Sequence, residues 1–213
     1  MFADLAIVGA HIKLLIILYG IVDLACAGSS QVVIILSDEF CHALTGMLLW
    51  SAIIIDSLDG HFSLEALRKI FIRQFAGNGK ELALAGFTSC ALDVDHFIAA
   101  GSASLQDATN LPHRPFGHAL AFVPCVSLLY YAVSRNSRTA KLLFVALLSH
   151  HLRDSMKRGL WLWPMDYSTP PIPFYYVFPM YLVLTWAMRL LMRCNPCRNE
   201  VNRDSDVVVL STV

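Results

Sequence analysis

Residues 142–158, LLFVALLSHHLRDSMKR, join an apolar stretch to a polar patch at the end of the same segment. His150 and Asp154 lie four residues apart, so a helix places them on one face about one turn apart. Ionisable side chains are costly in a bilayer, at roughly 2.5–3.5 kcal/mol for an Asp at a helix centre. The stretch therefore predicts a membrane helix whose polar end has a function.

The composition of the whole chain agrees with this interpretation. Of its 213 residues, 56% are hydrophobic and only 15% are charged, and the mean hydropathy is +0.57. A soluble domain carries about 25% charged residues, so the chain is too apolar to be soluble alone. The net charge is zero, and no basic excess points to a nucleic acid. The expected partner is the lipid bilayer.

Apolar runs recur along the chain, at 5–27, 40–57, 81–100, 118–134, 142–158 and 174–193. Several are shorter than the ~20 residues that span a hydrocarbon core, as expected for helices that end in a polar cavity enclosed by protein. We predict an all-α, polytopic membrane bundle of about six transmembrane helices. It forms a single domain over residues 1–197, followed by a flexible tail at 198–213. The first run also resembles a signal peptide, but Asp23 within it favours a retained helix.

Basic residues concentrate in alternate connections, which predicts that those connections are cytoplasmic. They are Arg68, Lys69, Arg73 and Lys80, then Arg135, Arg138 and Lys141, then Arg189, Arg193, Arg198 and Arg203. Lys157 and Arg158 are exceptions beside a polar patch, where a functional role could hold them. This orientation places the polar patches near the non-cytoplasmic face. Both the endoplasmic reticulum and the plasma membrane remain possible locations.

The polar patches contain the side chains that bind metals, and they recur at the same end of successive runs. They are His42, then Asp93, Asp95 and His96, then His113 and His118, then His150 and Asp154. Imidazole and carboxylate together suit zinc, manganese or iron better than calcium or copper(I). The simpler alternative for a single membrane histidine is a hydrogen bond between helices. Taken together, the patches favour a divalent metal site, with zinc as the first expectation.

A metal site of this kind could hydrolyse an ester or phosphoester bond, because a bound metal lowers the pKa of water toward 7. A site within the outer half of the bilayer would meet lipid headgroups, so a membrane lipid is the expected substrate. We expect Asp95 to accept a proton and Arg114 to hold an anionic group of the substrate.

The order and spacing of the patches resemble those of the bacterial YdjM-like inner-membrane metal-dependent hydrolases. Their pattern reads approximately LPDxDH, HRGxTHS, HxxxD and a downstream WP. Here the corresponding stretches are Leu92–His96, His113–His118, His150–Asp154 and Trp163-Pro164, and the resemblance covers roughly residues 38–178. Longer phrases such as LDVDHFIAAGS and SHHLRDSMKRGLWLWP are closer still to eukaryotic relatives. The resemblance implies metal binding by His42, Asp93, Asp95, His96, His113, His118, His150 and Asp154.

This chain departs from the family pattern at hydroxyl-bearing positions. Pro115, Gly117 and Ala119 stand where the pattern has Gly, Thr and Ser, so hydroxyls that could support the ligands are missing. The resemblance therefore implies metal binding more firmly than hydrolysis. The alternative is a non-enzymatic metal or proton transporter, or a degenerate scaffold-type membrane protein, since intramembrane His and Asp also build ion pathways. Apolar runs such as Leu142–Leu148 provide no polar side chains in the cytoplasmic half of the bundle, which favours an enclosed site over an ion pathway.

Overall fold

The computed structural model describes residues 2–55, 64–165 and 167–193, and the predicted tail at 198–213 lies outside them. Helices are the only regular secondary structure within these residues, apart from isolated bridges that Trp161 makes with Ala119 and Ser168. In chain order they are α1 (Phe2–Cys26), α2 (Gln31–Ile54), α3 (Leu64–Ala91), α4 (Val94–Ala100), α5 (Leu105–Thr109), the 3₁₀ turn η1 (Phe116–His118), α6 (Phe122–Ser134), α7 (Ser137–Arg158) and α8 (Phe174–Arg193).

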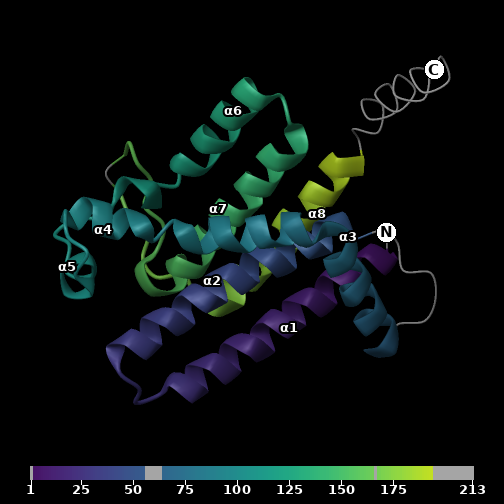
Figure 1. Cartoon of the computed structure of the whole chain (residues 1–213), viewed down its shortest axis with the longest axis horizontal. Helices are drawn as coiled ribbons and strands as arrows, with labels where there is room; N and C mark the ends of the chain where they lie inside the picture. The colour runs from purple at the N-terminus through teal and green to yellow at the C-terminus, as the bar shows by residue number, and fades with distance from the viewer. Residues whose placement is uncertain (1, 56–63, 166, 194–213) are drawn as a thin grey trace, which may run out of the picture.

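Helix α2 lies at the centre of the bundle and packs against α1, α3, α7 and α8 (Figure 1). Its contact with α3 is close because glycines face the partner helix. A Cβ atom at Gly46 would lie 2.7 Å from the carbonyl oxygen of Ala85, and one at Gly86 would lie 2.7 Å from Cγ of Met47. Small residues let helix backbones approach each other in membranes. The close approach brings the end of α3 beside the polar half of α7.

Helix α7 is enclosed by other helices, since it packs against α2, α3, α6 and α8. Polar side chains in its second half, including Ser149, His150 and Arg153, are buried. Its first turn is capped by Asn136, whose side-chain oxygen accepts from the backbone N–H of Thr139 at 3.0 Å. A helix surrounded by protein can carry such polar residues at membrane depth.

Within the residues that the structure describes, four helical stretches have the length and composition to cross a membrane: Val8–Cys26, Gln31–Ile54, Ile72–Ala100 and Phe174–Arg193. Helix α6 is apolar but has only 13 residues. The predicted all-α membrane bundle is therefore confirmed. The difference from six equivalent spans lies in α6, which is short, and in α7, whose polar residues are covered by its neighbours.

The two ends of the bundle differ in character. At one end, the Glu81 carboxylate accepts from Nε1 of Trp50 at 3.0 Å and from Nε of Arg138 at 2.7 Å. These contacts tie α2, α3 and the start of α7 together. The predicted polar patches lie at the opposite end, where α3 and α7 finish and the first half of α2 runs past them. Their position near the non-cytoplasmic face stays a prediction.

Candidate metal centre

Four side chains from three parts of the chain meet at the second half of α7: Asp93, His118 and, from α7 itself, His150 and Asp154. Nε2 of His118 lies 3.2 Å from Nε2 of His150, 3.2 Å from Oδ1 of Asp93 and 3.6 Å from Oδ2 of Asp154. Nε2 of His150 lies 3.7 Å and 3.8 Å from the same two carboxylate oxygens. One ligand atom from each residue lies within 4.8 Å of the others, so the four could hold one metal ion.

The spacing of these atoms can be compared with a known coordination shell. Zinc binds histidine nitrogen and carboxylate oxygen at about 2.0–2.1 Å in a tetrahedron, whose edges are then about 3.3 Å. The five distances given above run from 3.2 to 3.8 Å. Five of the six distances among the four atoms are therefore close to the edges of a tetrahedral shell, and the sixth, between the two carboxylate oxygens, is within 4.8 Å.

Both central histidines are held by their other ring nitrogen. Nδ1 of His150 lies 2.7 Å from the carbonyl oxygen of Ser89, and Nδ1 of His118 lies 3.1 Å from Oδ2 of Asp95. A carbonyl oxygen only accepts, so Nδ1 of His150 carries its proton and Nε2 is left for a ligand. Contacts of this kind fix the tautomer and ring orientation of metal-binding histidines. They aim both Nε2 atoms at the same point.

The charge state of His118 follows from its neighbours. Burial alone would lower the pKa of His118, but hydrogen bonds to the carboxylates of Asp93 and Asp95 raise it to about 9. In the metal-free protein at neutral pH, a proton on His118 therefore occupies the position that a cation would take. A metal ion must displace it, as is usual for histidine ligands.

His42 extends the centre toward α2. Its ring stacks on that of His150 with centroids 3.9 Å apart, and its Nε2 lies 3.3 Å from Oδ1 of Asp154. His42 is 1% exposed, yet neither ring nitrogen makes a hydrogen bond with the described residues. Buried polar atoms without partners are costly. A cation shared with Asp154 and with Asp38, which completes a second possible metal group, would remove that cost.

A third group that could hold a metal joins Asp95, His96 and His118. Nδ1 of His96 lies 3.1 Å from Oδ1 of Asp95 and 3.4 Å from Oδ1 of Asp93. Neither Nδ1 of His96 nor Oδ1 of Asp95 makes a hydrogen bond within the described part of the chain. Oδ1 of Asp93 thus lies between this group and the tetrahedral one.

Local structure places these ligands. The helix of α3 ends at Ala91, and α4 begins at Val94, so Asp93 projects from the break between them. On the other side, η1 carries His118, and the preceding Gly117 lies against Asp95. A Cβ atom at Gly117 would overlap Oδ2 of Asp95 and lie 3.1 Å from Cδ1 of Leu92. The glycine that replaces threonine in the family pattern is the residue that this close approach requires.

The structure brings together seven of the eight predicted metal ligands: His42, Asp93, Asp95, His96, His118, His150 and Asp154. His113 is exposed and belongs to none of the groups found among the described residues. Arg114 follows it, and its guanidinium donates to the backbone carbonyls of Gly159, at 3.1 Å, and of Arg158. Arg114 therefore anchors the end of α7 beside the centre.

Two acidic residues at the centre were missed by the sequence-based prediction. Asp38 completes the second metal group and also pairs with Arg153 and Lys157. Glu39 lies beside Asp93, and both line one cavity. The signal was present, because Asp38 and Glu39 precede His42 by four and three residues and therefore share its helix face.

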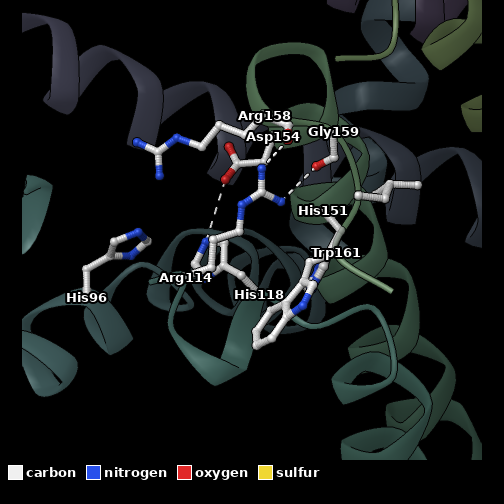
Figure 2. A pocket seen from close by; sticks show the side chains of 9 residues that line it. His96, Arg114, His118, His151, Asp154, Arg158, Gly159 and Trp161 are labelled. Carbon is white, nitrogen blue, oxygen red and sulfur yellow. Dashed lines mark hydrogen bonds and ion pairs between the residues drawn. The ribbon is translucent and has the colours of Figure 1, made fainter. Parts of the chain in front are cut away.

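Two cavities adjoin the candidate ligands and share His96, Asp154 and Arg158 on their walls. The smaller one, about 10 Å³, also touches His118 and Arg114 (Figure 2). It has room for about one water molecule. The larger one, about 130 Å³, lies between α2, α4, α5 and the end of α7. The centre is thus open to water on one side and to a larger molecule on the other.

Comparison with known proteins identifies relatives of this chain. It is 34% identical over 160 residues to transmembrane protein 267 of Xenopus laevis, a match that covers 72% of this chain and 64% of that protein. It is 32% identical over 181 residues to transmembrane protein 267 of Danio rerio, covering 82% of this chain and 74% of the relative. The chain therefore spans about two thirds of the Xenopus laevis protein and three quarters of the Danio rerio one. No solved structure matches it significantly.

A family model also matches most of the chain, over residues 38–203. Its description is YdjM inner membrane protein. The matched range includes the seven predicted ligands that meet in the fold, together with Asp38. The chain belongs to the YdjM inner membrane protein family.

Proposed function

We propose that this multi-pass membrane protein is a metal-dependent hydrolase of ester or phosphoester bonds in membrane lipids. The primary ligands are Asp93, His118, His150 and Asp154, with His42, Asp95 and His96 beside them. Zinc is the proposed ion, and manganese and iron are the alternatives that the same nitrogen and oxygen ligands can bind. The proposal places the centre near the non-cytoplasmic face of the membrane.

One observation carries the proposal: two histidine nitrogens and two carboxylate oxygens converge at tetrahedral spacing. Nε2 of His118 and Nε2 of His150 lie 3.2 Å apart, although each ring already uses Nδ1 for another contact. A hydrogen bond between helices, the simpler explanation for a membrane histidine, needs one donor and one acceptor. Four converging ligand atoms fit a metal better, and so do the neighbouring Nε2 of His42 and Nδ1 of His96, which lie close to carboxylates but make no hydrogen bond with the described residues.

A bound divalent metal would supply Lewis acidity and activate water for attack on an ester or phosphoester. The chain's own residues would prepare the site for that chemistry. Oδ2 of Asp95 orients His118, while its buried Oδ1 is the proposed proton acceptor. The cavity of about 10 Å³ beside Arg114 and Asp154 is the proposed position of the water. Arg114 retains donor hydrogens beyond the carbonyls that it holds, because a guanidinium has five.

A second candidate, an ion pathway, has one observation in its favour. Buried hydroxyls continue from the centre into the core, at Thr45, Ser149 and Thr185. Each of these, however, donates to a backbone carbonyl of its own helix, at 2.6–2.8 Å. Ser149 also contacts Oγ of Ser89 at 3.3 Å, and Thr45 contacts the hydroxyl of Tyr19. Among the described residues these contacts join the hydroxyls only in pairs. An enclosed centre agrees better with this arrangement than a pathway does.

The proposal is tested by assaying the purified full chain in phosphatidylcholine nanodiscs. Chelated protein is supplied with Zn²⁺, Mn²⁺ or Fe²⁺, and release of product from phospholipid and acyl-ester lipids is followed by mass spectrometry. Hydrolysis that returns only with metal is the expected result. Metal flux in proteoliposomes without hydrolysis would overturn the hydrolase and favour the pathway.

A further inference from the structure

The larger cavity beside the candidate metal centre has two chemically different walls. One wall is polar and carries the acidic residues Asp38, Glu39, Asp93 and Asp154, together with His96 and the cations Lys157 and Arg158. The other wall is apolar and is formed mainly by Ile35, Phe97, Leu105 and Ala108 from α2, α4 and α5. A cavity of about 130 Å³ with this division matches one charged group joined to a hydrocarbon chain.

The two cations on the polar wall differ in availability. Nζ of Lys157 lies 2.6 Å from Oδ2 of Asp38, so its charge is paired. The guanidinium of Arg158 makes no hydrogen bond or ion pair with any residue that the structure describes. It lies on the His96 side of Asp154, whereas the guanidinium of Arg114 lies on the Gly159 side (Figure 2). Within the described part of the chain, the donors of Arg158 are therefore available to a molecule in the cavity.

Arg114 holds the backbone from which Arg158 projects. Its two terminal nitrogens donate to the carbonyl oxygens of Arg158 and Gly159. Burial, with the neighbouring charge of Arg158, lowers the pKa of Arg114, while Asp154 opposes that change. Arg114 lines the smaller cavity and not the larger one, so its part is to hold the end of α7 from which Arg158 reaches the larger cavity. Gly159 allows the turn after α7, since its φ of 70° lies in the region that favours glycine.

We propose that Arg158 binds the phosphate of an anionic lipid phosphoester, and that Arg114 is its positioning residue. The inference rests on the proposed function and narrows it from esters in general to phosphoesters. A guanidinium fork matches the oxygens of a phosphate, whereas a carboxylic ester offers it no charge. The apolar wall then receives the lipid chain next to the phosphate.

The test uses the zinc-loaded full chain in phosphatidylcholine nanodiscs. Calorimetry measures the binding of inorganic phosphate and, separately, of short-chain phosphatidic acid, and elemental analysis measures bound zinc. The variants are Arg158→Gln, Arg158→Lys and, as a matched loss of charge, Arg73→Gln on the exposed surface of α3. Arg158→Gln should lower the affinity for phosphate and for phosphatidic acid about tenfold or more, while the zinc content stays unchanged. Arg158→Lys should retain part of the affinity, and Arg73→Gln all of it.

The outcomes separate this inference from the function on which it rests. Unchanged phosphate affinity in Arg158→Gln, with zinc retained, would overturn the role of Arg158 and leave the metal centre standing. Loss of zinc in Arg158→Gln would also overturn it, because the residue would then serve the metal. If the protein bound phosphate and phosphatidic acid with equal affinity, the lipid chain would add nothing to binding. The proposal that the ligand is a lipid would then be wrong. A wild-type protein that binds no zinc would overturn the proposed function, and this inference with it.

Discussion

Nε2 of His118 faces Nε2 of His150 at 3.2 Å, and the Nδ1 atom of each ring already contacts another residue. Two imidazole lone pairs at this distance repel each other unless a proton or a metal ion lies between them. The raised pKa of His118 indicates that a proton takes this place in the metal-free protein. The geometry of the pair therefore suits a shared cation, either a proton or a metal ion.

Substitution of Asp95 should weaken metal binding without abolishing it. Asp95→Asn removes the charge that orients His118 through Nδ1, and changes to such supporting partners reduce metal affinity by roughly 10–100-fold. Competition with a zinc chelator measures the change. Asp107→Asn, at an exposed carboxylate on α5, is the matched control and should behave as wild type. Equal zinc affinity in the two variants would exclude the orienting role.

Metal affinity should increase with pH. His118 has a pKa of about 9 in the metal-free protein, so below that pH the metal displaces a proton from it. The apparent affinity should therefore fall about tenfold for each unit of acidification below pH 9. Calorimetry in buffers of different ionisation enthalpy measures the released proton directly. Zinc binding without proton release at neutral pH would contradict the protonated state.

Gly117→Ala should damage the centre although it adds only one methyl group. The new Cβ atom would overlap the carboxylate of Asp95, so either that carboxylate or the η1 turn must move. We expect zinc affinity to fall by about tenfold or more. Gly79→Ala on α3 meets nothing within 4 Å and is the matched control. Normal zinc binding by Gly117→Ala would show that Asp95 can move without consequence.

Gly46→Ala should destabilise the bundle itself. Its Cβ atom would lie 2.7 Å from the carbonyl oxygen of Ala85 and 2.8 Å from Cβ of Ser89, so α2 and α3 must separate. Overpacking of this kind costs roughly 1–3 kcal/mol. Thermal unfolding in detergent should show a lower Tm than for Gly20→Ala, which meets nothing within 4 Å. Equal Tm values would refute the tight contact.

The sequence predicts the helices well where hydrophobicity alone defines them. The run at 174–193 has the bounds of α8, and the run at 142–158 falls within α7. The prediction fails where a helix begins or ends for reasons other than hydrophobicity. Helix α3 begins at Leu64, far before the apolar run at 81–100, because Leu, Glu, Lys and Arg, which recur between residues 64 and 81, favour a helix without forming an apolar run. The break between α3 and α4 falls inside the same apolar run at 81–100, which gives no sign of it, and α5 at Leu105–Thr109 lies outside every predicted run.

The candidate site shows the same limits. Helical spacing predicts that His150 and Asp154 lie on one face, and Nε2 of His150 lies 3.8 Å from Oδ2 of Asp154. Contacts between helices depend on packing, which spacing does not reveal. His113 has the right chemistry and the right motif, but the turn after it carries His118 inward and leaves His113 exposed. The position of Arg158 depends on Arg114, which donates to the backbone carbonyl oxygen of Arg158. The sequence gives no sign of this contact.

The central claim is that these side chains share a metal ion, and elemental analysis of the purified, detergent-solubilised protein tests it most directly. Wild type should contain stoichiometric zinc, manganese or iron. His118→Ala and Asp154→Ala should lose it, because each removes one of four converging ligands. His113→Ala, at the exposed histidine of the same motif, should retain it. Full stoichiometric metal in both His118→Ala and Asp154→Ala would contradict the account.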